Sequence, residues 1–151
     1  MQQTKKFRLS LLRSAVAIPV GVVIYEVTAF GILLLVGYVF FPIFTNENML
    51  DPVERDHAVV IIQVCGVTAG LIGAFVVAWV AGRAEVQHAL AFGAIVTALA
   101  VLYPPENLGD WPLWGVISRL LLPIPVCWVG GYLRKIVRSR RKSRDRSPVL
   151  N

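Results

Sequence analysis

The chain has 151 residues, of which 56% are hydrophobic and only 16% are charged, and its mean hydropathy is +0.67. Soluble globular proteins average roughly 45–50% apolar and about 25% charged residues, so the composition excludes a large soluble enzyme, a multidomain receptor and a disordered chain. The net charge is +6, from 15 Lys and Arg against 9 Asp and Glu. The fold class that we predict is an all-α membrane protein, a bundle of four transmembrane helices.

The first apolar run extends from about Ser14 to Phe41. It is longer than the roughly 20 residues that a membrane-spanning helix needs and too long for the apolar region of a signal peptide, which has about 7–15 residues. We therefore expect a retained span that ends at Pro42, because proline disfavours a continuing helix. A polar loop from Thr45 to His57 follows.

Three further apolar runs follow, separated by a short turn at 82–85 and by a loop with two prolines at 104–110. They predict spans at about 58–81, 86–103 and 111–133. The predicted organisation is a basic N-terminus at 1–13, a transmembrane domain at 14–134 and a basic tail at 135–151.

The positions of the basic residues predict the orientation of the bundle. Of the 15 Lys and Arg residues, all but Arg55 and Arg119 lie near the two ends of the chain or in the turn at 82–85. Loops rich in Lys and Arg stay on the cytoplasmic side of a membrane. We therefore expect both termini in the cytoplasm. The small size and the lack of an organelle-targeting signal favour a bacterial inner membrane.

Small residues recur at helical spacing on the second and third spans. Gly66, Gly70 and Gly73 share one face of the second, and Ala89 and Gly93 lie four residues apart on the third. Small residues allow helices to approach closely in lipid. Because the turn between these spans is short, we expect the two faces to form a tight antiparallel hairpin.

The fourth span contains Pro123 and Pro125, and each lacks the backbone donor that a helix uses. We predict a kink just below Arg119. Either these are tolerated transmembrane prolines, or the kink is a hinge or an ion-coordinating break.

Two charges lie deep in apolar runs, Glu26 in the first span and Arg119 in the fourth. At 1.5 Å per residue, Glu26 is about 18 Å above Ser14 and Arg119 about 21 Å above Leu133. Charges at such depths usually find a partner inside the protein, so we expect an ion pair between them, with Gln63 extending the polar patch. The pair either fixes which helices meet, or its carboxylate loads and releases a proton during transport.

The segment Ala17–Leu34, with the sequence Val-Ile-Tyr-Glu-Val at 23–27, resembles the first helix of the small multidrug resistance transporters. Those proteins also have four spans and a membrane-embedded glutamate in the first. The resemblance implies that Glu26 is a shared proton and cation site. It covers less than a fifth of the chain, which departs from the family in its length, in Arg119, in its basic tail and in lacking the aromatic-glycine motif of the third span.

The C-terminal tail carries a cluster of basic residues directly after the last span. Such clusters bind anionic lipid headgroups at the cytoplasmic face, and they also set topology. Nucleic acid is not expected as a partner, because no aromatic residues are interleaved to stack bases. The predicted lipid-binding residues are Arg134, Lys135, Arg138, Arg140, Arg141 and Lys142.

The sequence shows no catalytic set and no cofactor motif. It also shows no metal-ligand cluster, because Glu85 and His88 supply only two possible ligands where zinc needs three or four. We therefore do not expect an enzyme. The leading hypothesis is an accessory, scaffold or assembly component of a membrane complex, bound to another membrane protein or to itself. The alternative is a small proton-coupled transporter or channel that uses Glu26.

Overall fold

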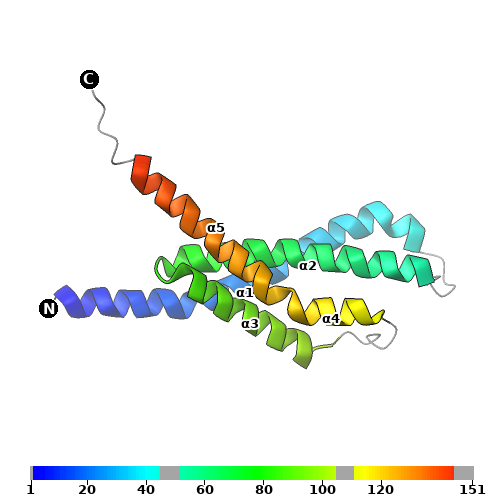
Figure 1. Ribbon diagram of the computed structural model, residues 1–151, viewed down its shortest axis with the longest axis horizontal. Coiled ribbons are helices and arrows are strands. Elements are labelled where there is room, and N and C mark those ends of the chain that lie inside the picture. Colours follow the sequence, from blue (N-terminus) through cyan, green and yellow to red (C-terminus); the bar gives the residue numbers. More distant parts are fainter. Residues whose placement is uncertain (1, 45–51, 105–110, 145–151) are drawn as a thin grey trace, which may run out of the picture.

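The computed structural model describes residues 2–44, 52–104 and 111–144, with side chains described at 13–36, 56–104 and 111–141. Within these ranges the chain is all helical (Figure 1). The helices are α1 (Gln2–Phe44), α2 (Pro52–Ala81), α3 (Glu85–Leu102), α4 (Leu113–Leu121) and α5 (Pro123–Arg144). Four stretches are long and apolar enough to cross a membrane, at 13–36, 56–81, 85–102 and 113–141.

The first helix is longer than the sequence predicted at both ends. It begins at Gln2, so most of the segment expected as a basic N-terminus is helical, and it continues past Pro42 to Phe44. The expected stop at Pro42 was wrong. A proline so close to the end of a helix removes one backbone donor from a turn that has few bonds left to lose.

The connection between α2 and α3 was predicted closely. The second helix begins at Pro52, where proline is favoured in the first turn, and ends at Ala81. Gly82 and Ala84 both take a left-handed backbone conformation, with φ of 67° and 48°. This conformation stops α2 and redirects the chain into α3, which starts at Glu85.

The predicted fourth span is divided into α4 and α5 at Leu122, directly before Pro123. The amide of Leu122 still donates to the carbonyl of Ser118 at 2.9 Å, and Val126 donates to Leu122 at 3.1 Å. The chain therefore stays helical across the division while α5 leaves at an angle to α4 (Figure 1). The helix then continues to Arg144, well beyond the expected end of the span.

The small residues pack differently from the expected hairpin. A Cβ atom on Gly93 would lie 3.0 Å from the Cβ of Cys127, and one on Gly70 would lie 3.2 Å from Val126. These small residues of α2 and α3 therefore face α5. Gly73 does face α3, since its Cβ would lie 2.9 Å from the Phe92 ring.

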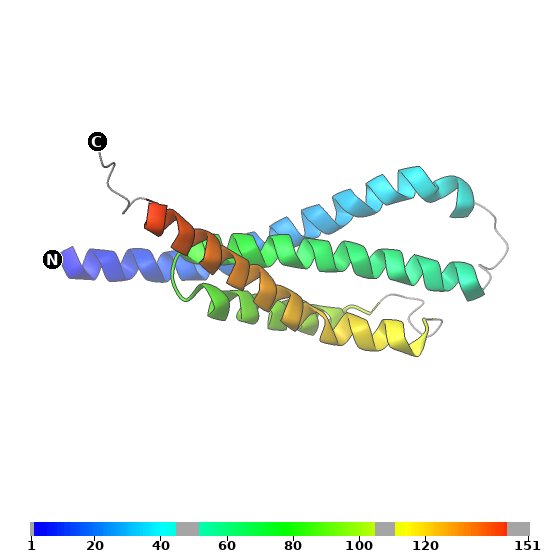
Figure 2. The same cartoon turned by 45° about the horizontal axis from the view of Figure 1, so that its top comes forward.

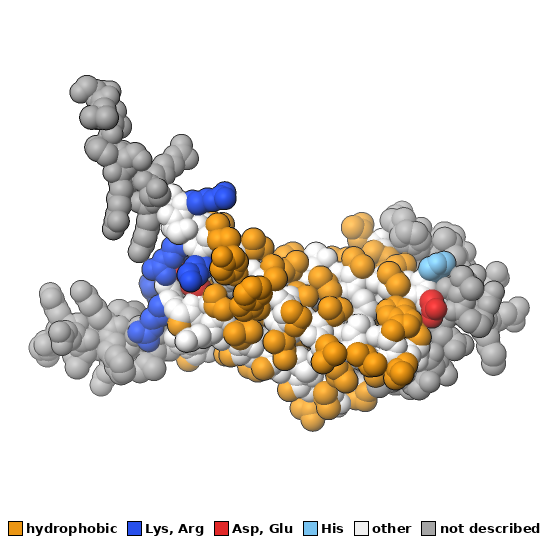
Figure 3. Space-filling model, viewed as in Figure 1, with side chains coloured by type: hydrophobic (Ala, Val, Ile, Leu, Met, Phe, Trp, Pro, Cys, Tyr) orange, Lys and Arg blue, Asp and Glu red, His pale blue; other side chains and the backbone are white. Residues whose placement is uncertain are grey.

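The two ends of the bundle differ in the charge of their described side chains. In Figure 3 the Lys and Arg side chains in view gather at the end that holds the α2–α3 turn, an acidic and a histidine side chain lie at the opposite end, and hydrophobic side chains cover the middle. At the opposite end α1 diverges from α2 (Figure 2). We call the basic end the inner end and the other the outer end.

Candidate functional site

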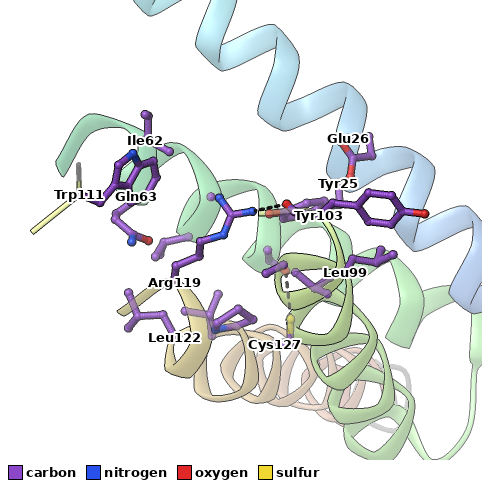
Figure 4. Close-up of a pocket in the computed structure, with 17 residues that line it drawn as sticks. Tyr25, Glu26, Ile62, Gln63, Leu99, Tyr103, Trp111, Arg119, Leu122 and Cys127 are labelled. Carbon is purple, nitrogen blue, oxygen red and sulfur yellow. Dashed lines mark hydrogen bonds between the residues drawn. The ribbon is translucent and has the colours of Figure 1, made fainter. Parts of the chain in front are cut away.

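A cavity of about 450 Å³ lies between the helices in the outer half of the bundle. Every one of the five helices contributes to its wall, which is mainly apolar. Its polar and aromatic side chains come from residues far apart in the sequence: Tyr25, Glu26, Gln63, Tyr103, Trp111 and Arg119. Figure 4 shows Arg119 between Gln63 and Trp111 on one side and the α1 residues on the other.

Gln63 joins α2 to α4. Its side-chain amide donates to the carbonyl of Gly115 at 2.8 Å and to the hydroxyl of Ser118 at 2.8 Å. The Ser118 hydroxyl in turn donates to the Gly115 carbonyl at 3.0 Å. This network joins α2 to α4 at the wall of the cavity, and Gln63, which was expected to extend the polar patch, lines that cavity with Arg119.

Arg119 projects from α4 across the cavity. Its Nη2 donates to the carbonyl of Tyr103 at 3.2 Å, and Tyr103 caps the C-terminus of α3. The guanidinium carbon lies 5.9 Å from the centre of the Trp111 ring, within the range of a cation–π contact. A guanidinium has five N–H donors, and Nε of Arg119 is buried without a hydrogen-bond partner. The protein therefore satisfies this group only in part.

Glu26 reaches the cavity from α1 and is exposed in the isolated chain. Among the described residues, none lies within hydrogen-bonding or ion-pairing distance of its carboxylate. The neighbouring Tyr25 packs its ring edge-on against Phe92, with ring centres 6.3 Å apart. That contact anchors α1 to α3 directly beside the carboxylate.

The structure thus places Glu26, Gln63 and Arg119 at one cavity; similar depths had been predicted for Glu26 and Arg119. It does not join Glu26 to Arg119 in the expected ion pair. The physical reason is that Arg119 donates to the α3 terminus at Tyr103 instead, while α1 diverges from the other helices at the outer end (Figure 2). Two opposite charges therefore line one cavity without contacting each other.

The described residues do contain one ion pair, at the inner end, and the sequence reasoning missed it. Nη1 of Arg138 lies 2.9 Å from the carboxylate of Glu85 and donates to the Gly82 carbonyl at 2.6 Å. The Glu85 side chain is only 6% exposed. Arg138, which was predicted to bind lipid, therefore has a partner inside the protein. The clue in the sequence was Glu85, the single acidic residue in the short turn at 82–85.

Two glycines of α5 were not predicted from the sequence as packing residues. Both Gly130 and Gly131 are buried. A Cβ atom on Gly131 would lie 2.6 Å from the Cβ of Ala89, and one on Gly130 would lie 2.8 Å from the Leu71 carbonyl. They allow α5 to contact α2 and α3 closely, so they tighten the inner half of the bundle.

No group of three or more His, Cys, Asp or Glu that could hold a metal ion is present in the described part of the chain. Comparison of the chain with protein-family models, with curated proteins and with solved structures found no match. What the cavity does is therefore inferred from its geometry and chemistry.

Proposed function

We propose that the chain is a small proton-coupled membrane transporter in which Glu26 exchanges a proton for a positively charged group of the transported solute. One observation carries this proposal. A carboxylate with no hydrogen-bond or ion-pair partner among the described residues lines a cavity in the apolar part of the bundle. A charge at this depth is costly without a partner, so a carboxylate retained only for structure would be expected to have one.

The chemistry of the cavity suits such an exchange. A carboxylate in an apolar site binds either a proton or a cation, because each neutralises the charge that lipid disfavours. The Tyr25 and Trp111 rings line the same cavity, and aromatic faces attract organic cations. When the solute binds, the proton leaves the Glu26 carboxyl group for water, and it returns when the solute departs on the other side.

The proposal includes a bilayer around the four apolar stretches, with the inner end in the cytoplasm of a bacterial cell. The gathering of basic side chains at the inner end supports this orientation (Figure 3), because Lys and Arg are retained on the cytoplasmic side. Cysteine substitutions at Arg83 and Asp56 would test it. A membrane-impermeant thiol reagent added to intact cells should label position 56 and not position 83, and the reverse pattern would overturn the orientation.

A flux measurement tests the transport proposal. Full-length protein in liposomes that contain a pH-sensitive dye is given a proton gradient and then a quaternary ammonium solute, choline or glycine betaine. We expect solute-dependent proton movement for the wild type and for Asp56→Asn, a carboxylate control at the outer end, and none for Glu26→Gln. Equal proton movement for wild type and Glu26→Gln, or none for the wild type, would refute the proposal.

A second candidate function rests on a different observation. One side of α1 is apolar and exposed in the described chain, at Val23, Val27, Phe30 and Leu34. A Cβ atom on Gly31 would meet nothing within 4 Å. A face of this kind suits an accessory or scaffold subunit that packs against another membrane protein. Mild-detergent purification with mass spectrometry distinguishes the two, since a stoichiometric foreign partner favours the accessory role.

A further inference from the structure

Two opposite charges, Glu26 and Arg119, line the same cavity and do not form an ion pair with each other. Among the described residues Glu26 has no hydrogen-bond or ion-pair partner, and the contacts of Arg119 are with the Tyr103 carbonyl and the Trp111 ring. If the cavity served a simple cation, Arg119 would repel it at short range. If it served a simple anion, Glu26 would do the same. A ligand with both charges would meet both side chains favourably.

We infer that the cavity binds a zwitterion, with its positive group at Glu26 and its negative group at Arg119. This inference rests on the proposed function, because it names the substrate class of the same site. A carboxylate or phosphate of the ligand takes the guanidinium donors that Tyr103 leaves unused. A quaternary or primary ammonium sits against the carboxylate and the Tyr25 ring.

The dimensions and the walls of the cavity agree with this ligand class. Its volume of about 450 Å³ exceeds that of a small zwitterion and falls within the range of ligand pockets, about 300–1,000 Å³. The remaining wall is mostly aliphatic, with Val96, Leu99 and Leu122 among its residues. Such a wall accommodates the methyl groups of a trimethylammonium or the first part of an acyl chain.

The same charge pattern has two sources, a free zwitterionic solute and the headgroup of a zwitterionic phospholipid. Both present an ammonium and an acid group a few bonds apart. The lipid composition around the protein separates them, because phosphatidylcholine supplies the headgroup and phosphatidylglycerol does not.

The test uses a matched pair of probes on the full-length chain in phosphatidylglycerol nanodiscs. Glycine betaine and choline share the trimethylammonium group and differ in whether a carboxylate or a hydroxyl follows it. We expect calorimetry to show betaine binding about tenfold or more tighter than choline, which corresponds to one charge-assisted contact. Equal affinities, or no betaine binding, would overturn the zwitterion inference.

Variants assign the negative group to Arg119. In Arg119→Gln we expect the preference for betaine over choline to shrink to about twofold or less, while Arg83→Gln, at the exposed inner turn, should keep the wild-type preference. Because Arg119 also caps α3, Arg119→Lys serves as a second variant that keeps the charge and loses the fork. Arg119→Lys should keep part of the preference for betaine over choline. A full wild-type preference in Arg119→Gln would overturn the assignment of the negative group to Arg119.

Nanodiscs of phosphatidylcholine then identify the source. If a lipid headgroup occupies the cavity, betaine affinity falls in these discs relative to phosphatidylglycerol discs. If a free solute is the ligand, the affinity is the same in both, so either outcome is compatible with a zwitterion site and assigns its occupant. Betaine binding without Glu26-dependent proton flux would refute the transport proposal alone. Glu26-dependent proton flux together with equal affinities for betaine and choline would refute the zwitterion inference alone.

Discussion

Two carboxylates of this protein lie in opposite halves of the bundle and have opposite surroundings. At the inner end, Glu85 is almost fully buried, with Arg138 2.9 Å away. In the outer half, Glu26 lines a cavity with no partner among the described residues. At the inner end, an arginine neutralises a buried carboxylate and joins two helices. In the outer half, the carboxylate is left without a cation, and such a group can bind an exchangeable ligand.

The packing of the two halves differs in the same way. In the inner half, glycines let helices approach until a single added methyl group would clash, as at Gly131 against Ala89. In the outer half α1 diverges (Figure 2), and a Cβ atom on Gly66 would come no closer than 4.0 Å to the Tyr25 hydroxyl. Elsewhere in the outer half α4 does pack closely on α2, since a Cβ atom on Gly115 would lie 2.7 Å from Val59. The looser packing is therefore on the α1 side of the outer half.

The largest effect on stability should come from Arg138→Gln. It leaves the Glu85 carboxylate, 6% exposed, without its cation, and losing one partner of a buried pair costs about 3 kcal/mol when the other partner is partly exposed. Denaturant titration in mixed micelles measures this, with Arg83→Gln as the control for loss of a basic charge at the same end. Equal small losses in both variants would contradict the structural role of the pair.

Gly131→Ala should be the next most disruptive change. The added methyl group would lie 2.6 Å from the Cβ of Ala89, and overpacking of this kind costs about 2 kcal/mol. Gly31→Ala is the matched control, because its methyl group would meet nothing within 4 Å and alanine favours a helix. The same titration should separate the two, and a stabilised Gly131→Ala would show that the inner half is not close-packed.

Gln63→Leu should have a smaller effect. It removes the two hydrogen bonds to Gly115 and Ser118, and interhelical hydrogen bonds in lipid contribute about 1 kcal/mol together. Ser118 still donates to the Gly115 carbonyl, which limits the loss. A loss of stability as large as that of Arg138→Gln would contradict this ranking. It would mean that the hydrogen bonds of Gln63 stabilise the bundle as much as the ion pair at the inner end.

The smallest effect on stability should come from Glu26→Gln. In the proposed mechanism the ligand-free carboxyl group carries a proton, so glutamine replaces one uncharged group with another, and it breaks no hydrogen bond or ion pair among the described residues. Changes of this kind stay within about 0.5 kcal/mol. Unfolding of Glu26→Gln beside Asp56→Asn measures it. A large destabilisation would instead indicate the ion pair with Arg119 that the sequence suggested.

Hydropathy was sufficient to predict the four long apolar helices and the turn at 82–85, because runs of apolar residues and a glycine-containing break are local signals. The same local signals could not predict that α1 continues through Pro42, since the cost of a proline depends on its place in the helix. Nor could they show that Gly130 and Gly131 pack against α2 and α3, because a glycine for flexibility and a glycine for close approach look alike in a sequence.

The candidate site was predicted by its residues and not by its contacts. Depth along the helices placed Glu26 and Arg119 together, and Gln63 was expected to extend that polar patch. It could not show that the α3 terminus at Tyr103 lies within reach of Arg119, because that depends on where the third helix ends relative to the fourth. Arg138 was read as part of a lipid-binding tail for a similar reason, since its partner Glu85 is distant in sequence.

The central claim is that the paired carboxylate is structural and the unpaired one binds a ligand. Thermal unfolding of wild type and Glu26→Gln in phosphatidylglycerol nanodiscs, with and without glycine betaine, tests it most directly. We expect the same melting temperature for both proteins without ligand and a rise with betaine only in the wild type, because a ligand stabilises the state that binds it. A melting temperature for ligand-free Glu26→Gln as low as that of Arg138→Gln, with no betaine effect on the wild type, would contradict it.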